Sequence, residues 1–382
     1  MKRTSWMAIL VVLLMLYTVT LGARALDIHE YFDTQAQLDA LGVSEAAQLL
    51  PEKTRGLMED GGFRELSVQS LLQLSPGQFF AAIWRAFLQE LHRPIRIFAA
   101  LLGMTLLCAL LGGLRDDLRN SSMREVFGAV TILCMISSAA APILDCIIST
   151  VDAIKNASVF MLGYIPVFSA AVMAAGQPVT GAAYNGILFM VCQIISQAVS
   201  QTLLPLLSLY LALCIVGGLA PGLGISAMCA GIKKIVTWAL GFIITVFVGV
   251  LSAQTMVAGS ADSLTVRTAK FAVSSFVPVV GSTLSEAMLA AQGCLRLIRT
   301  SVGAFGILAA LGLFLPVFLQ VIVWFFVTNA AAAASDLLGV KEVGGVLRDC
   351  SGALSIMMTF LLCYALLMIV TITVVIVTGL GV

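Results

Sequence analysis

The sequence predicts an all-α fold, a polytopic helical membrane protein with about six to eight transmembrane helices. Sixty per cent of its residues are apolar and 11% are charged, against roughly 45–50% and 25% in an ordinary globular domain. Residues 156–232 and 235–261 contain no Asp, Glu, Lys, Arg or His. Several apolar runs reach the ~20 residues that a helix needs to cross the hydrocarbon core. A water-soluble surface cannot be built from this composition.

The first 25 residues have the order of an export signal. Lys2 and Arg3 precede an apolar core, and Ala23-Arg24-Ala25 fits a cleavage site. We therefore predict a signal peptide over 1–25, an extracytoplasmic helical region over 26–94 and a transmembrane domain over 95–382. The alternative is an uncleaved signal anchor, which also places 26–94 outside the cytoplasm. The apolar stripe of 80–91 suits a helix lying at the membrane interface or one packed within a small domain.

Six apolar runs are long enough to be spans: 95–114, 126–148, 187–218, 235–258, 302–328 and 352–378. Two more, 157–175 and 268–294, are interrupted by proline or glycine and either cross or are re-entrant. Basic residues near short loops mark the cytoplasmic side, and here they are Arg115, Arg119, Arg124, Lys233 and Lys234. An even number of crossings must separate these two basic loops. This favours a re-entrant 157–175, unless 187–218 is two short spans around Pro205.

The two interrupted segments resemble each other, which indicates an internal repeat of 157–258 and 268–380. FMLGYIPV (160–167) matches FAVSSFVPV (271–279), and a second proline follows each segment 38 or 39 residues later. Irregular backbone at membrane depth occurs where it lines a cavity. The pattern predicts equivalent helix breaks along a translocation path at Pro166, Pro205, Pro278 and Pro316. The alternative is a chance alignment of prolines, which are common in membrane helices.

Glu286 is the ionisable residue most expected at membrane depth, where a charge indicates function. The alternative places it in water on an amphipathic helix. The two histidines, His29 and His92, lie outside the apolar region, and no phosphate loop or HExxH motif occurs. The sequence therefore predicts no catalytic residue, metal site or cofactor. The net charge of +1 also gives no basic footprint for nucleic acid.

Residues 265–287, TVRTAKFAVSSFVPVVGSTLSEA, are followed by a proline-containing span over 302–328 and an apolar C-terminal helix. This order resembles the stage III sporulation protein AE family of endospore-forming bacteria. The resemblance implies a non-enzymatic, multi-pass subunit of the mother-cell (outer forespore) membrane. It also implies a place in the channel complex that joins mother cell to forespore and is required for late forespore development. The implied partners are other membrane subunits, a separate ATPase, extracytoplasmic ring proteins and the lipid bilayer.

The residues alone leave a second function open. Two repeats with broken helices would also suit a self-contained secondary transporter.

Overall fold

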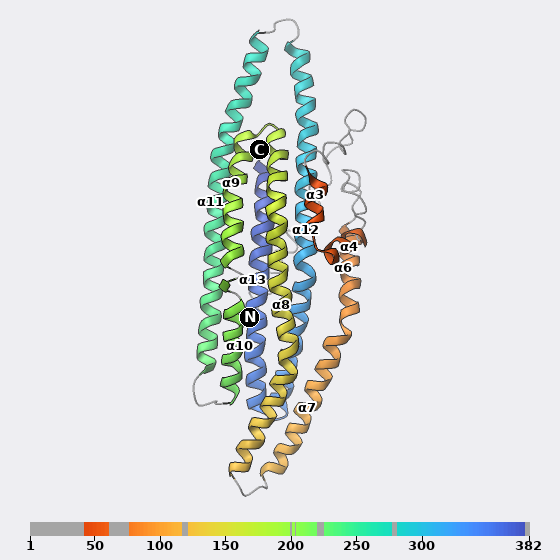
Figure 1. Ribbon diagram of the computed structural model, residues 1–382, viewed down its shortest axis with the longest axis vertical. Coiled ribbons are helices and arrows are strands. Elements are labelled where there is room, and N and C mark those ends of the chain that lie inside the picture. Colours follow the sequence, from red (N-terminus) through yellow and green to blue (C-terminus); the bar gives the residue numbers. More distant parts are fainter. Residues whose placement is uncertain are drawn as a thin grey trace.

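The structure is a computed structural model, and it describes residues 42–60, 76–116, 121–198, 201–202, 204–219, 225–276 and 281–378. Its regular elements over these ranges are helices (Figure 1). The predicted signal peptide, Arg119 and Pro278 lie outside the described residues. The helices are α3 (Val43–Gln48), α4 (Glu52–Asp60), α6 (Pro76–Glu90), α7 (His92–Asp116), α8 (Ser121–Ala174), α9 (Pro178–Ala198), α10 (Leu204–Leu219), α11 (Ile225–Phe276), α12 (Gly281–Leu337) and α13 (Lys341–Thr378).

Three of the helices are much longer than a bilayer is thick. α8, α11 and α12 contain 54, 52 and 57 residues. At 1.5 Å per residue each is about 80 Å long, whereas the hydrocarbon core is only about 30 Å thick. Each helix must therefore extend well beyond a membrane that it crosses.

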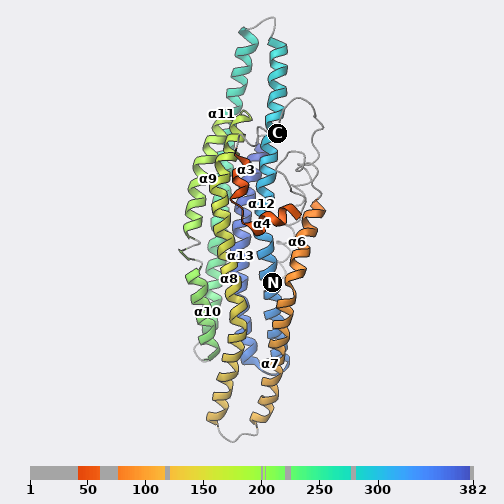
Figure 2. The same cartoon turned by 45° about the vertical axis from the view of Figure 1, so that its right-hand side comes forward.

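The long helices run alternately up and down one bundle (Figures 1 and 2). The starts of α8, α11 and α13 lie at one end, here called the Lys234 end. The α8–α9 turn and the last residues of α13 lie toward the other end, here called the Asp262 end, and the paired ends of α11 and α12 project beyond them. Glycines with positive φ turn the chain at both ends, Gly176 (φ 88°) between α8 and α9 and Gly339 (φ 81°) between α12 and α13.

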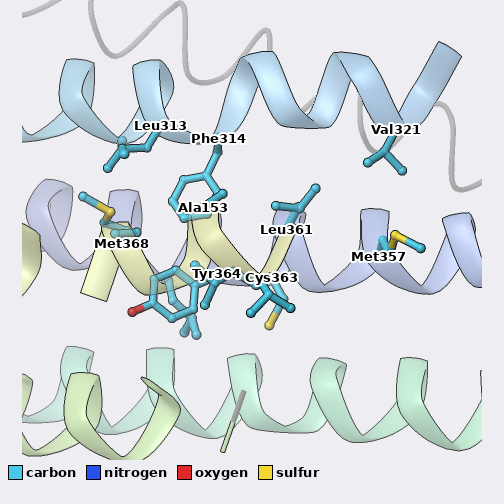
Figure 3. Packing of buried hydrophobic residues seen from close by; sticks show 14 of the residues in the cluster. Ala153, Leu313, Phe314, Val321, Met357, Leu361, Cys363, Tyr364 and Met368 are labelled. Carbon is cyan, nitrogen blue, oxygen red and sulfur yellow. The ribbon is translucent and has the colours of Figure 1, made fainter. Parts of the chain in front are cut away.

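α13 forms the centre of the bundle and contacts α8, α10, α11 and α12. Figure 3 shows its apolar side chains between the neighbouring helices. The ring of Phe314 from α12 lies 5.7 Å from that of Tyr364, centroid to centroid. The Tyr364 hydroxyl is 2.7 Å from Ser158 Oγ of α8, so the polar group of this buried tyrosine is also satisfied.

Among the described residues, four helices have stretches long and apolar enough to cross a membrane: Ala139–Ala174, Ala227–Leu264, Leu297–Leu337 and Val343–Val374. Three shorter apolar helices, Pro94–Leu107, Pro178–Val191 and Pro205–Cys214, add to them. The predicted all-α, polytopic fold class is confirmed.

The prediction of a re-entrant segment at 157–175 is wrong. Residues 121–174 form one continuous helix, so the expected span 126–148 and the segment after it are parts of α8. The other ambiguous segment, 268–294, comprises the end of α11 and the beginning of α12. These ends extend as a helical pair beyond the rest of the bundle (Figure 1). The sequence analysis did not predict these continuous, protruding helices. Hydropathy and proline positions do not show how far a helix extends beyond the membrane.

The short helices α3 and α4 pack on the side of the bundle, against α8 and α12 respectively. Two glycines make room for them. A Cβ at Gly163 would collide with the Leu49 side chain, and one at Gly312 would lie 3.0 Å from Thr54 Cγ2. Part of the region predicted to be extracytoplasmic is thus attached to the membrane bundle.

Candidate functional site

The most distinctive polar site of the bundle lies where α9 begins. Pro178 opens α9, as proline often does at the first helical position, but Gln177 before it is a poor N-cap. The cap comes from α11 instead. The two carboxylate oxygens of Asp262 accept the backbone N–H groups of Val179 at 2.9 Å and Thr180 at 2.8 Å. Asp262 is only 2% exposed, and a buried carboxylate is well placed beside the positive end of a helix dipole.

A buried arginine from α12 joins the same site. Arg299, 3% exposed, donates one hydrogen bond to Gln177 Oε1 at 2.8 Å and another to the Ile376 carbonyl at 2.9 Å. The first bond fixes the α8–α9 turn, and the second satisfies a carbonyl in the last turn of α13. Asp262, Arg299 and Gln177, here called the polar cluster, thus connect the ends of α8, α9 and α13 to α11 and α12.

Aromatic side chains fill the bundle next to the polar cluster. Tyr164 stacks between Phe160 and Phe168, with ring centroids 5.2 and 5.5 Å apart. Its hydroxyl donates to the Val302 carbonyl at 2.9 Å. A Cβ at Gly306 would lie 2.5 Å from Tyr164 Cζ, so α12 approaches the ring closely only because this residue is glycine.

The predicted helix breaks at Pro166 and Pro316 are wrong, because α8 and α12 continue through both. A proline inside a helix removes one backbone hydrogen bond but does not always end the helix. Pro166 is exposed, while Tyr164 and Phe168 on either side are fully buried and hold the helix in place. Pro205 lies in the first turn of α10, after α9 has ended at Ala198.

The other candidate residues are placed as follows. Glu286 lies near the start of α12, and its place along a translocation path stays a prediction. Arg115 and Arg124 lie at the end of α7 and the start of α8. These helix ends lie at the Lys234 end of the bundle (Figure 1). Lys233 is half-buried and Lys234 exposed, both in α11.

The polar cluster was missed by the sequence reasoning, although two signals pointed to it. Asp262 ends the charge-free run 235–261, and Arg299 precedes another, 300–335. The Gly-Gln-Pro sequence at 176–178 marks a turn into a helix without a good cap of its own. Only the fold shows that these three positions meet.

Two spaces among the described residues show how closely the helices pack. The space bounded by Met161, Leu188, Phe247 and Met368 holds only about 20 Å³, roughly one water molecule. A larger groove of about 410 Å³ lies at the surface between α9 and α11, lined by alanine and valine side chains and by Gln254. The geometry is that of a close-packed bundle whose polar contacts join helices.

These features define a polytopic α-helical membrane protein. The chain belongs to the stage III sporulation protein AE family, whose model matches residues 63–379. It is similar to stage III sporulation protein AE of Bacillus subtilis (strain 168), with 24% identity over 399 residues that cover 99% of this chain and 98% of that protein. No solved structure matches the chain.

Proposed function

We propose that the chain is a multi-pass subunit of the sporulation channel complex that connects mother cell and forespore. Its proposed location is the mother-cell membrane. The observation that carries the proposal is family membership over 63–379, together with the apolar helices of a membrane protein. The proposed partners are other membrane subunits, a separate ATPase and extracytoplasmic ring proteins. No step of this role requires covalent chemistry by the chain itself.

The close packing of the bundle indicates how such a subunit would act. Phe160, Tyr164, Phe168 and Phe305 are buried side by side, so they occupy the interior where a single-chain channel would need water. We infer that the transport path lies between this chain and its partners. The self-contained transporter has less support, since two of its four expected helix breaks are continuous helix.

The proposed orientation has the Lys234 end in the cytoplasm and α3 and α4 outside. Asp336 and Arg348 form an ion pair at the Lys234 end, with Arg348 Nη1 2.6 Å from Asp336 Oδ2. Thr54 of α4 packs on Gly312, which precedes Asp336 by 24 residues of continuous α12. This length is about 36 Å, slightly more than the hydrocarbon core. α4 therefore lies about one membrane thickness from the ion pair, which supports its place at the outer interface.

Orientation is tested with reporters inserted at the two glycine turns. Alkaline phosphatase inserted after Gly176 should be active, and a fluorescent protein inserted after Gly339 should be fluorescent in the cytoplasm. The exchanged insertions, fluorescent protein after Gly176 and phosphatase after Gly339, serve as matched controls. Active phosphatase after Gly339 would refute the orientation.

Function is tested by deleting the gene in its endospore-forming host and measuring a late forespore reporter. We expect loss of the reporter, rescue by the intact chain and copurification with other membrane subunits from sporulating cells. The purified chain alone in liposomes should transport nothing. Coupled uptake by these liposomes would support the transporter instead, and normal late expression in the deletion would refute the proposal.

A further inference from the structure

Two opposite charges lie on the outer face of α8, within its candidate membrane span. Asp152 and Lys155 are both exposed and belong to Ala139–Ala174. Neither makes a hydrogen bond or ion pair within the part of the chain that the structure describes. Ionisable side chains inside a membrane are costly and usually pair with one another or face water. Asp152 and Lys155 therefore have no polar partner among the described residues.

The charges belong to a regular stripe. Residues on the outward side of α8 recur at alternating steps of four and three, which is the spacing of a helix that packs along another helix. Five of them are exposed and Asp145 is half-buried. The stripe, here called the α8 face, consists of Ala141, Asp145, Ile148, Asp152, Lys155 and Val159.

The opposite side of α8 is already occupied by the chain itself. Ser158 contacts Tyr364 of α13, Tyr164 contacts Val302 of α12, and Phe168 packs against Tyr184 of α9 with ring centroids 5.3 Å apart. These contacts fix the rotation of α8 about its axis. The α8 face is consequently held toward the outside of the bundle and cannot turn its charges inward.

We propose that the α8 face is the contact surface for a second copy of this chain. Two copies inserted in the same orientation are related by a twofold axis along the membrane normal, which makes their α8 helices parallel. A twofold contact is self-complementary. In parallel packing each Asp152 faces the partner's Asp152, and the partner's Lys155, three residues further on, lies in the next layer of the contact. The four side chains form a neutral group of two acids and two bases. One copy alone leaves both charges facing lipid.

The inference goes beyond the proposed function and does not depend on it. A dimer along α8 would form whatever the chain transports, and the sporulation channel could include the chain without such a contact. The measurements below follow the α8 contact directly, so their failure leaves the proposed function intact.

The test is disulfide crosslinking of the full-length chain in native membranes. Cys134, the exposed cysteine described on α8, is first replaced by serine. Ile148→Cys and Val159→Cys are then introduced separately, and Ile243→Cys of α11 serves as the matched control. Ile243 is 45% exposed and also lies within a candidate span, whereas Ile148 and Val159 are 56% and 51% exposed.

The expected result is an oxidation product of twice the monomer mass from both α8 variants and none from Ile243→Cys. In the Val159→Cys background, Asp152→Lys or Lys155→Asp alone should reduce the product to the level of the control. The double exchange should restore it, because it keeps the same four charges. Copies with Asp152→Lys, mixed with copies carrying Lys155→Asp, should also crosslink to each other.

Equal crosslinking in the single-charge variants would overturn the proposal, provided that the variants accumulate normally. A product with the mass of a different protein would assign the α8 face to another partner. The absence of any α8 product from well-accumulated protein would assign it to lipid or water. Either outcome would refute the second copy as the occupant.

Discussion

Replacing Asp262 tests whether the polar cluster holds α9 in place. Asp262→Ala removes both acceptors of the Val179 and Thr180 amides, and the buried amides are left without partners. Hydrogen bonds to a charged group contribute about 1.5–3 kcal/mol each, and loss of an N-cap costs about 0.5–2 kcal/mol. Because these two contributions overlap, we expect a loss of about 3 kcal/mol, concentrated at the start of α9.

Hydrogen exchange of the purified protein in detergent measures the effect where it should occur. A loss of about 3 kcal/mol corresponds to about a hundredfold faster exchange of the Thr180 amide, since 1.4 kcal/mol is tenfold. Asp262→Asn keeps one acceptor and should have an intermediate effect. Ser260→Ala is the control, because Ser260 is exposed and donates only within its own helix, to Met256.

The outcome that would refute the reasoning is specific. If Asp262→Ala and Ser260→Ala gave the same exchange at Thr180, the carboxylate would not be the cap of α9. If exchange increased uniformly through α8, α9 and α13, the residue would stabilise the bundle as a whole and not the helix start. Both patterns can be distinguished in one experiment.

Three further predictions concern packing and the prolines. Arg299→Met should lower the midpoint of thermal unfolding in detergent more than Gln177→Ala does. The arginine variant loses the bond to Gln177 and also leaves the Ile376 carbonyl without its donor. Equal midpoints would contradict the assigned bonds. Gly306→Val should prevent accumulation in the membrane, because its Cβ would overlap the Tyr164 ring, whereas Gly241→Val, with open space around it, should accumulate normally. Pro166→Ala should leave protein level and spore yield unchanged, because α8 is already continuous there and alanine restores a backbone hydrogen bond. A sporulation defect at normal protein abundance would show that the proline has a functional role.

The sequence was sufficient for the properties that depend on composition and on neighbouring residues. Long runs without charge can be stable only in lipid or in a helical bundle, so the fold class followed from them. The motif at 265–287 was sufficient to indicate the family. The basic residues around Arg115 and Lys234 were expected on one side, and the structure places the helix ends that carry them at the same end of the bundle.

The failures have a common physical cause. Pro166 and Pro316 were expected to break helices because a local rule was applied to residues whose neighbours decide the outcome. Buried Tyr164 and Phe168 hold α8 on both sides of Pro166, and this packing offsets the missing backbone hydrogen bond. The re-entrant segment at 157–175 was expected because the proline and the basic loops were read without the length of α8, which runs unbroken over 54 residues.

What the sequence by itself determined is therefore the class of the chain: an apolar, helical membrane protein of the sporulation family. Only the tertiary structure decided which residues meet. Asp262 and Val179 are 83 positions apart in the chain, and nothing local relates them until α9 folds back along α11. Likewise, the charges of Asp152 and Lys155 indicate a partner surface only because the opposite side of α8 packs against α9, α12 and α13. Hydropathy and helix signals act over a few turns, whereas such contacts depend on the rotation and register of whole helices, which packing fixes.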